Sequence, residues 1–204
     1  MPDRKLWGAD PCYGRQKVLA VQASGCTPKP AEASATREYL YTFERNFVGT
    51  VRLAPLPSAA ANSTIVMRLG EWLEQGVPKT RGDVQLESFT LAAGHQPPLE
   101  AVFVWHGYQY VLVTCTGATT FGGSLESLTG LEIRTDMESV SSIRFGGVTE
   151  ASTTAASLFN RINAMSRARM VGNVAAGIPT DCPTAEKRGY LGDASFAAPG
   201  TLWN

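Results

Sequence analysis

The chain has 204 residues, of which 44% are hydrophobic and 18% charged, and its 18 basic side chains balance 18 acidic ones. This composition suffices for one domain with a buried core, and it excludes a collagen-like, coiled-coil or fully disordered chain. A net charge of zero also argues against a general nucleic-acid coat or a polybasic membrane binder.

The N-terminus and the cysteines bear on where the chain works. No apolar run approaches the ~20 residues of a membrane helix, and Met1–Trp7 lacks the hydrophobic core of a signal peptide. None of the four cysteines lies in a C-x-x-C pair, which predicts reduced thiols, with one disulfide between the chain ends as the alternative. We therefore expect a virion or cytoplasmic location, without a signal peptide or transmembrane segment.

Charge is distributed unevenly along the chain. Residues 1–56 carry 8 basic and 5 acidic side chains, residues 57–150 carry 5 and 10, and residues 151–204 carry 5 and 3. The net charge of zero therefore conceals an acidic middle between two basic ends.

Proline and glycine are dense at both ends, where neither helical nor strand periodicity extends over a useful length. We therefore predict an extended N-terminal arm over residues 1–36 and an extended C-terminal arm over residues 172–204. Between them, residues 37–171 are predicted to form an α+β body.

The first predicted elements are strands followed by a helix. Lys17–Val21 is a candidate short strand, and the aromatic and β-branched residues of Glu38–Leu53 predict one or two strands. A helix is expected from Asn62 or Ser63 to about Gln75, ended by Gly76. Its apolar face would consist of Ile65, Val66, Leu69, Trp72 and Leu73. Val84–Ala92 is expected to return as a strand.

A hairpin is the most distinct pattern in the middle of the chain. Leu99–Trp105 and Tyr108–Thr116 flank a two-residue His106-Gly107 loop. Both faces of this hairpin are apolar, so we expect each to be covered, by the chain's own helices or by another subunit.

The remaining elements complete the predicted fold. Strands are expected at Leu131–Thr135 and Val140–Phe145, and a second helix from Thr149 to Met170. The buried face of this helix would consist of Ala155, Leu158, Phe159, Ile162 and Met165. The predicted fold class is α+β, a mostly antiparallel sheet with two amphipathic helices, flanked by extended N- and C-terminal arms.

Metal and nucleophile chemistry finds little support in the sequence. The only histidines are His95 and His106, and no Cys, His or acidic cluster has metal-ligand spacing. His106 and Cys115 share the predicted hairpin and lie nine positions apart, roughly 30 Å, so they cannot form a dyad there. Phosphate-loop and nucleophile-elbow motifs are also missing, and we predict no cofactor and no metal.

Paired carboxylates could serve glycoside hydrolysis. The acidic middle offers Glu71, Glu74, Glu126, Glu132, Asp136 and Glu138. No spacing singles out two of them, and several acids in one domain most often form a solvated face, so no catalytic residue is assigned.

Two basic motifs have competing interpretations. Arg161, Arg167 and Arg169 either complement the negative end of the second helix or contact phosphate or RNA. Arg81-Gly82-Asp83 matches an adhesive tripeptide, but three-residue matches are common by chance.

Aromatic residues in the arms suggest a surface for partners, because interfaces are rich in such side chains. The candidate interface residues are Trp7, Tyr13, Tyr190, Phe196, Trp203, Arg161, Arg167 and Arg169.

The predicted function is a structural, non-enzymatic subunit of a large virion-like or phage-particle-like assembly, whose arms clasp neighbouring subunits. Its partners would be copies of itself, other subunits of an assembly, or both; nucleic acid is possible but not indicated, and no membrane is expected.

Two alternatives remain open on the sequence. The chain could be an accessory or linker subunit of a large cellular complex, which shares the same arms. It could also be a small enzyme or nucleic-acid binder of unrecognised type, although sparse histidines and missing motifs count against the enzyme.

Overall fold

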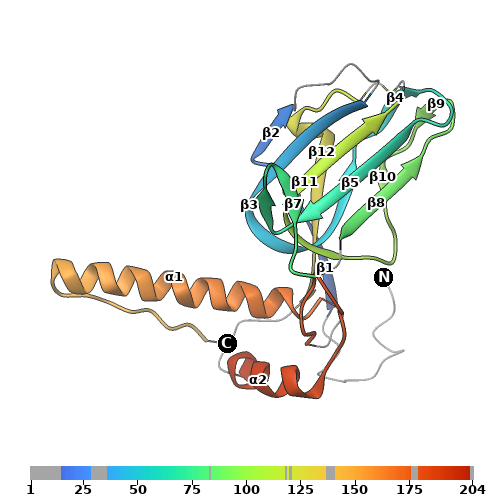
Figure 1. Cartoon of the computed structure of the whole chain (residues 1–204). Helices are drawn as coiled ribbons and strands as arrows, with labels where there is room; N and C mark the ends of the chain where they lie inside the picture. Colours follow the sequence, from blue (N-terminus) through green and yellow to red (C-terminus); the bar gives the residue numbers. More distant parts are fainter. Residues whose placement is uncertain are drawn as a thin grey trace. The chain divides into compact units, whose positions relative to one another are not determined.

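The computed structural model describes residues 15–28, 36–82, 84–117, 119, 121–136, 141–175 and 179–202. They fall into two compact units, which we call the β unit (Val18–Ile133 and Cys182–Lys187) and the helical unit (Met1–Lys17, Arg134–Asp181 and Arg188–Asn204). Figure 1 labels most of the elements. They are β1 (Arg15–Gln22), β2 (Gly25–Pro28), β3 (Thr36–Leu53), β4 (Leu56–Ala59), β5 (Thr64–Gly70), β6 (Trp72–Glu74), β7 (Val77–Lys79), β8 (Gln85–Thr90), β9 (Gly94–Gln96), β10 (Leu99–Glu100), β11 (His106–Thr116), the short 3₁₀ helix η2 (Leu125–Ser127), β12 (Leu128–Asp136), α1 (Glu150–Gly172) and α2 (Leu191–Leu202).

One large sheet dominates the described fold (Figure 1). Its strand order is β1-β12-β3-β11-β5-β8, and both β2 and β10 pair with β3. The pairs that β3 makes with β2, β10, β11 and β12 are antiparallel, as are those of β5 with β8 and β11. Smaller two-stranded sheets join β4 to β9 and β6 to β7. Strands distant in the sequence thus lie side by side, in a jelly-roll-like arrangement.

The core is built on β3, which confirms the strand predicted over Glu38–Leu53. The rings of Phe43, Phe47 and Tyr108 pack together with centroid distances of 4.6–5.6 Å. The Tyr108 hydroxyl donates to the Thr50 carbonyl oxygen at 2.6 Å, so the buried phenol keeps a partner. The strands predicted at Lys17–Val21, Val84–Ala92 and Leu131–Thr135 are confirmed as β1, β8 and β12.

The helix predicted from Asn62 or Ser63 to about Gln75 is wrong, because this segment forms strands β5 and β6. Ile65, Met67 and Leu69 are buried in alternation with half-buried neighbours, the period of two that a strand requires. Gln75 and Gly76 both have positive φ and connect β6 to β7. Such a pair favours a hairpin turn, so Gly76 is a turn residue and not the end of a helix.

The hairpin predicted around His106-Gly107 is also wrong. Both residues lie inside β11, opposite Gly49 and Val48 of β3. Only Leu99 and Glu100 form β10, which pairs with β3 and not with β11. Phe103, in the first predicted strand of the hairpin, has a φ of 61° and a fully exposed side chain, so the strand does not extend through it.

The predicted fold class is corrected in consequence. The chain is mainly an antiparallel, jelly-roll-like sheet with two helices, not an α+β body with extended arms. The expected N-terminal arm contains strands β1 and β2 of the sheet, and the expected C-terminal arm contains α2. Residues 141–145 of the strand predicted at Val140–Phe145 are not in a strand. The division of the chain at residues 36 and 172 is a separate expectation and stays a prediction.

Helix α1 confirms the helix predicted from Thr149 to Met170. Thr149 caps its first turn, since its side chain accepts from the Ser152 N–H and the Ser152 hydroxyl accepts from the Thr149 N–H. The segment before α1 runs back along it (Figure 1), where the Asn160 amide exchanges two hydrogen bonds of 2.9 Å with the Phe145 backbone. The Phe145 and Phe159 rings pack 5.3 Å apart.

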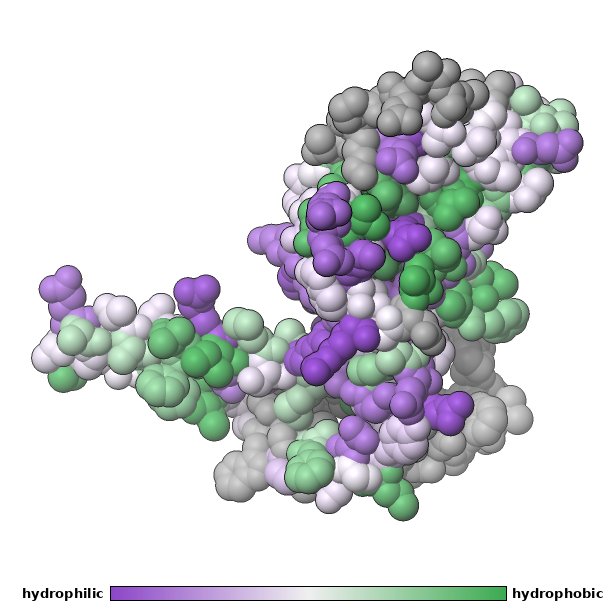
Figure 2. Space-filling model, viewed as in Figure 1, coloured by the Kyte–Doolittle hydropathy of each residue, from purple (hydrophilic) through white to green (hydrophobic). Residues whose placement is uncertain are grey.

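The buried face predicted for this helix is wrong. Ala156 is the buried residue among the described side chains of α1. Leu158, Phe159, Ile162 and Met165 are 48–69% exposed, and Figure 2 shows apolar residues gathered along this helix. The periodicity was that of a helix, but the apolar side of the helix is not covered in this structure.

A first prediction tests the close approach of β3 to β12. A Cβ at Gly49 would stand 1.9 Å from the Leu131 carbonyl oxygen, a backbone atom that cannot move without disturbing the sheet. We expect Gly49→Ala to lower the free energy of unfolding by about 2 kcal/mol or more. The control is Gly122→Ala, where a Cβ meets nothing within 4 Å. Urea denaturation measures both; equal stability of the two variants would contradict the packing.

A second prediction distinguishes strand from helix at β5. Met67 is fully buried, whereas its neighbour Arg68 is half-buried. We expect Met67→Ala to cost about 2–5 kcal/mol of unfolding free energy, because it leaves a cavity in the core. Arg68→Ala is expected to cost less than about 1 kcal/mol. Thermal and urea unfolding provide the comparison, and a larger loss for Arg68→Ala would refute the alternation.

Candidate functional site

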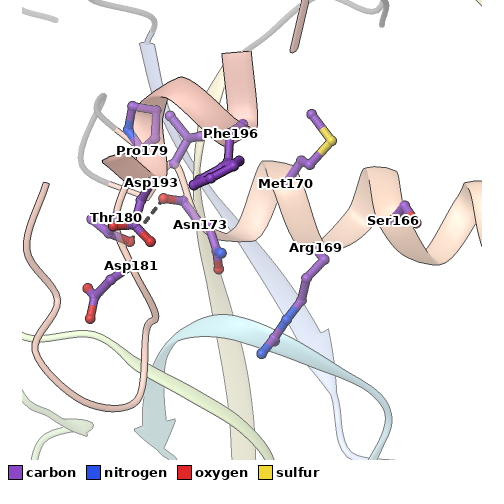
Figure 3. A pocket seen from close by; sticks show the side chains of 11 residues that line it. Ser166, Arg169, Met170, Asn173, Pro179, Thr180, Asp181, Asp193 and Phe196 are labelled. Carbon is purple, nitrogen blue, oxygen red and sulfur yellow. Dashed lines mark hydrogen bonds between the residues drawn. The ribbon is translucent and has the colours of Figure 1, made fainter. Parts of the chain in front are cut away.

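An open pocket of about 370 Å³ lies within the helical unit (Figure 3). The end of α1, the loop that follows it and the start of α2 supply its walls. Its lining residues are Ser166, Arg169, Met170, Asn173, Val174, Pro179, Thr180, Asp181, Asp193, Phe196 and Ala197. Concave sites with an apolar wall and a few polar groups are the usual places for small ligands.

The loop after α1 is fixed by hydrogen bonds around Asn173. The Asn173 N–H donates to the Arg169 carbonyl oxygen at 3.0 Å and ends the helix. The Thr180 N–H and hydroxyl both donate to the Asn173 carbonyl oxygen, at 2.8 and 3.0 Å (Figure 3). On the other side, the Thr135 N–H and hydroxyl donate to the Val174 carbonyl oxygen. The backbone that forms this side of the pocket is therefore fixed without a ligand.

The polar groups of the pocket differ in how they are used. The Asp181 carboxylate accepts the Arg188 N–H at 3.1 Å, and the Asp181 N–H donates to the Arg188 carbonyl oxygen at the same distance. Asp181 thus closes the loop formed by residues 182–187. The buried Asn173 Oδ1 has no hydrogen-bond partner among the described residues. Phe196 is 89% exposed and offers its ring as an apolar wall.

The sequence-predicted interface residues are only partly brought together. Arg169 and Phe196 line the same pocket, whereas Arg161 and Arg167 lie earlier on α1 and Tyr190 precedes α2. Trp7, Tyr13 and Trp203 lie outside the described residues. A role of these eight residues in binding copies of the chain or other subunits stays a prediction.

Sequence reasoning missed the polar members of the pocket. The segment predicted to be an extended arm contains Asn173, Thr180 and Asp181. Asp193 lies in α2, which was not predicted as a helix because it contains Pro199 and Gly200. The Asp193–Phe196 spacing of three was the available signal, because it places both side chains on one helix face.

The carboxylates considered for glycoside hydrolysis do not form a pair in the described structure. Glu132 is bonded to Arg45 at 2.7 Å, Glu71 accepts from Asn46 at 2.9 Å, and Glu74 lies 3.7 Å from Lys79. Glu126 lies in η2 and Asp136 ends β12, while Glu138 is outside the described residues. None of the five described carboxylates lines the pocket, and none of the six is assigned a catalytic role.

Thiol and metal chemistry is equally unsupported in the described part of the chain. Burial raises the pKa of the Cys115 thiol to about 12, which keeps it protonated and poorly nucleophilic. Cys26, Cys115 and Cys182 are in no disulfide. Within residues 15–136 and 141–202, apart from the undescribed positions, no three His, Cys, Asp or Glu side chains form a group that could hold a metal ion.

Comparison with known proteins gives a consistent result. Residues 32–134 match the family model of the bacterial alpha-L-rhamnosidase concanavalin-like domain, and residues 149–204 match that of the bacterial alpha-L-rhamnosidase 6 hairpin glycosidase domain. An alpha-L-rhamnosidase of Formosa agariphila is 28% identical over 123 residues, which are 60% of this chain and 12% of that protein.

Solved structures agree on the fold. The alpha-L-rhamnosidase of Dictyoglumus thermophilum has a TM-score of 0.70 at 20% identity, covering 94% of this chain and 20% of its own. That of Streptomyces avermitilis, solved with L-rhamnose, has a TM-score of 0.65 at 24% identity, covering 93% and 17%. The chain therefore spans about one-eighth to one-fifth of the length of these three relatives.

These matches overturn the functional prediction. A structural subunit of a virion or phage particle, and a non-enzymatic role, are both wrong, because the two matched models describe domains of a glycosidase. The virion location has no support among these relatives. In the described part of the chain, no helix is long and apolar enough to cross a membrane.

The match over residues 32–134 alone includes half of the 204 residues and coincides with most of the large sheet. The chain belongs to the bacterial alpha-L-rhamnosidase family, through its concanavalin-like domain.

Proposed function

We propose that this chain is part of an α-L-rhamnosidase, a glycoside hydrolase that releases L-rhamnose from α-linked glycosides. The supporting observation is the order of the two family matches. The concanavalin-like match falls on the β unit, and the glycosidase match begins at Thr149, the residue that caps α1. The chain therefore carries the change from one domain type to the other in a single polypeptide.

The two units have different tasks in this proposal. The β unit is the support, since it contains most of the large sheet and the aromatic core. Both helices of the helical unit fall in the glycosidase match, and the pocket beside Arg169 and Phe196 is a surface of that domain.

The bond-breaking chemistry requires two carboxyl groups, one to protonate the leaving oxygen and one to act as base or nucleophile. In the described residues, the carboxylates of Glu71, Glu74 and Glu132 already have protein partners. We therefore assign these three carboxylates no role as catalytic acid or base, and propose that this chain supports and positions the groups that react.

A chimera tests the proposal. The matching fifth of the Dictyoglumus thermophilum enzyme is replaced by this chain, since the two folds align over 94% of its residues. We expect the chimera to retain more than about a tenth of the parent's kcat/KM on an aryl α-L-rhamnoside. The same enzyme without the segment is expected to lose at least about a hundredfold, because the glycosidase domain loses its support.

The control replaces the same segment with an unrelated antiparallel β-sandwich of similar length. A chimera that melts cooperatively like the parent, but is no more active than this control, would contradict the proposal. Activity toward a matched aryl β-D-glucoside is measured alongside, and a preference for it over the rhamnoside would contradict the substrate class.

A further inference from the structure

The segment Cys182–Lys187 connects α1 to α2 in the sequence, yet it packs as part of the β unit. Its base is closed by the paired hydrogen bonds of Asp181 and Arg188. We call these six residues the strap.

Two glycines of the β unit make room for the strap. A Cβ at Gly107 of β11 would lie 2.8 Å from side-chain atoms of Pro183 and Thr184. A Cβ at Gly82 would lie 2.6 Å from Ala185 Cβ and from the Thr184 carbonyl oxygen. Gly82 of the Arg81-Gly82-Asp83 tripeptide is therefore a packing position.

The last residue of the strap, Lys187, reaches into the β unit. Its Nζ donates to the Trp105 carbonyl oxygen at 2.5 Å and lies 3.5 Å from His106 Nδ1 and 6.0 Å from the centre of the Trp105 ring. Burial lowers the pKa of Lys187, while the charges of Glu87 and Cys182 raise it. The ammonium is thus partly desolvated and needs a negative partner.

The negative partner is the Glu87 carboxylate, which is connected to Lys187 through His106. His106 Nε2 lies 2.5 Å from Glu87 Oε1, and the two residues are only 5% and 9% exposed. The neighbouring Gly107 exchanges two hydrogen bonds with the buried Gln85 amide, at 2.8 and 3.1 Å, which fixes the β11 backbone beside the imidazole. Glu87, His106 and Lys187 therefore form one chain of polar groups from β8 to the strap.

One pattern of protons satisfies every contact in this chain. An ammonium can only donate, so the Nδ1 that faces Lys187 must accept. The Nε2–H then donates to the Glu87 carboxylate, and the imidazole is neutral. In this state the positive charge of Lys187 balances the negative charge of Glu87.

We propose that Lys187, His106 and Glu87 form an acid-sensitive latch, in which a proton on His106 competes with the Lys187 ammonium and releases the strap. An imidazolium bonded to Glu87 balances the buried carboxylate by itself. The imidazolium would also point its Nδ1–H toward the Lys187 ammonium. Both groups are donors and both are positively charged, so they repel each other.

The sign of the pH dependence follows from the proton count. The docked strap faces a neutral imidazole, and the released strap leaves an imidazole that can hold one more proton beside Glu87. The released state therefore binds more protons, and docking weakens as the pH falls. Among the described residues, the ionisable groups around the latch are Glu87 from β8 and Lys187 and Cys182 from the strap, with Glu186 exposed next to Lys187.

Hydrogen exchange of the full chain tests the latch. The exchange is measured by mass spectrometry on peptides that cover the strap, and the rates are corrected for the pH dependence of intrinsic exchange. Between about pH 8 and about pH 5, the range in which histidine changes charge, we expect protection of the strap to fall at least about tenfold. Protection of β5 serves as the internal reference and stays constant. Constant protection of the strap over this range would overturn the proposal.

Variants separate the contributions of the three residues. Lys187→Met removes the ammonium and is expected to leave the strap unprotected at both pH values, whereas Lys79→Met, at an exposed ion pair, leaves it unchanged. His106→Gln can still accept from Lys187 and donate to Glu87 but cannot titrate, so its strap is expected to stay protected at low pH. Loss of protection at low pH in His106→Gln would show that another group titrates.

A spectroscopic measurement needs no variant. Long-range ¹H–¹⁵N correlation of the histidine ring is expected to show His106 as the neutral Nε2–H form at about pH 8. An Nδ1–H form, or an imidazolium, at a pH where the strap is protected would overturn the latch. None of these readouts depends on rhamnoside hydrolysis, so the latch and the proposed function can fail separately.

Discussion

The fold depends on the close packing of β3 between two neighbours. Gly49 of β3 lies opposite His106 of β11 on one side and Glu132 of β12 on the other. Its missing side chain lets the Leu131 carbonyl oxygen approach to a distance that any Cβ would forbid. Gly130 does the same for the rings of Phe43 and Phe47, which a Cβ there would meet at 2.6–2.9 Å. Removing bulk from the backbone at these points allows bulky aromatic side chains to fill the core beside it.

The same sheet also carries the buried charge that the latch uses. An isolated carboxylate at the position of Glu87 would be costly, because few water molecules can reach it. The sequence supplies the balancing charge from Lys187, one hundred residues later. A residue between the two helices thus completes the polar interior of the β unit.

The exposed apolar residues explain why composition suggested an assembly. Met165, Leu191 and Phe196 are 69–90% exposed, an arrangement that often marks a surface for further protein. Aromatic residues outside a predicted core were the basis for inferring arms that clasp neighbouring subunits. Of these aromatic residues, Phe196 lies on α2, in a segment that matches a glycosidase domain. Apolar residues outside a predicted core indicate that a surface will be covered. They do not indicate whether a neighbouring subunit or another part of a large enzyme covers it.

The sequence by itself determined those strands and helices whose hydrophobic pattern is compatible with only one type of secondary structure. The β-branched and aromatic run of β3 and the long capped helix α1 were predictable, because each has one period over many residues. Shorter apolar runs were not: β5 and β6 satisfied a helical spacing by chance, and the choice was made by pairing with β8, β11 and β7. His106-Gly107 resembled a turn, but the pairing of β11 with β3 placed it within a strand. The polar chain of Glu87, His106 and Lys187 was decided only by the tertiary structure, because the balance of buried charge depends on distances in space that separation along the chain does not encode.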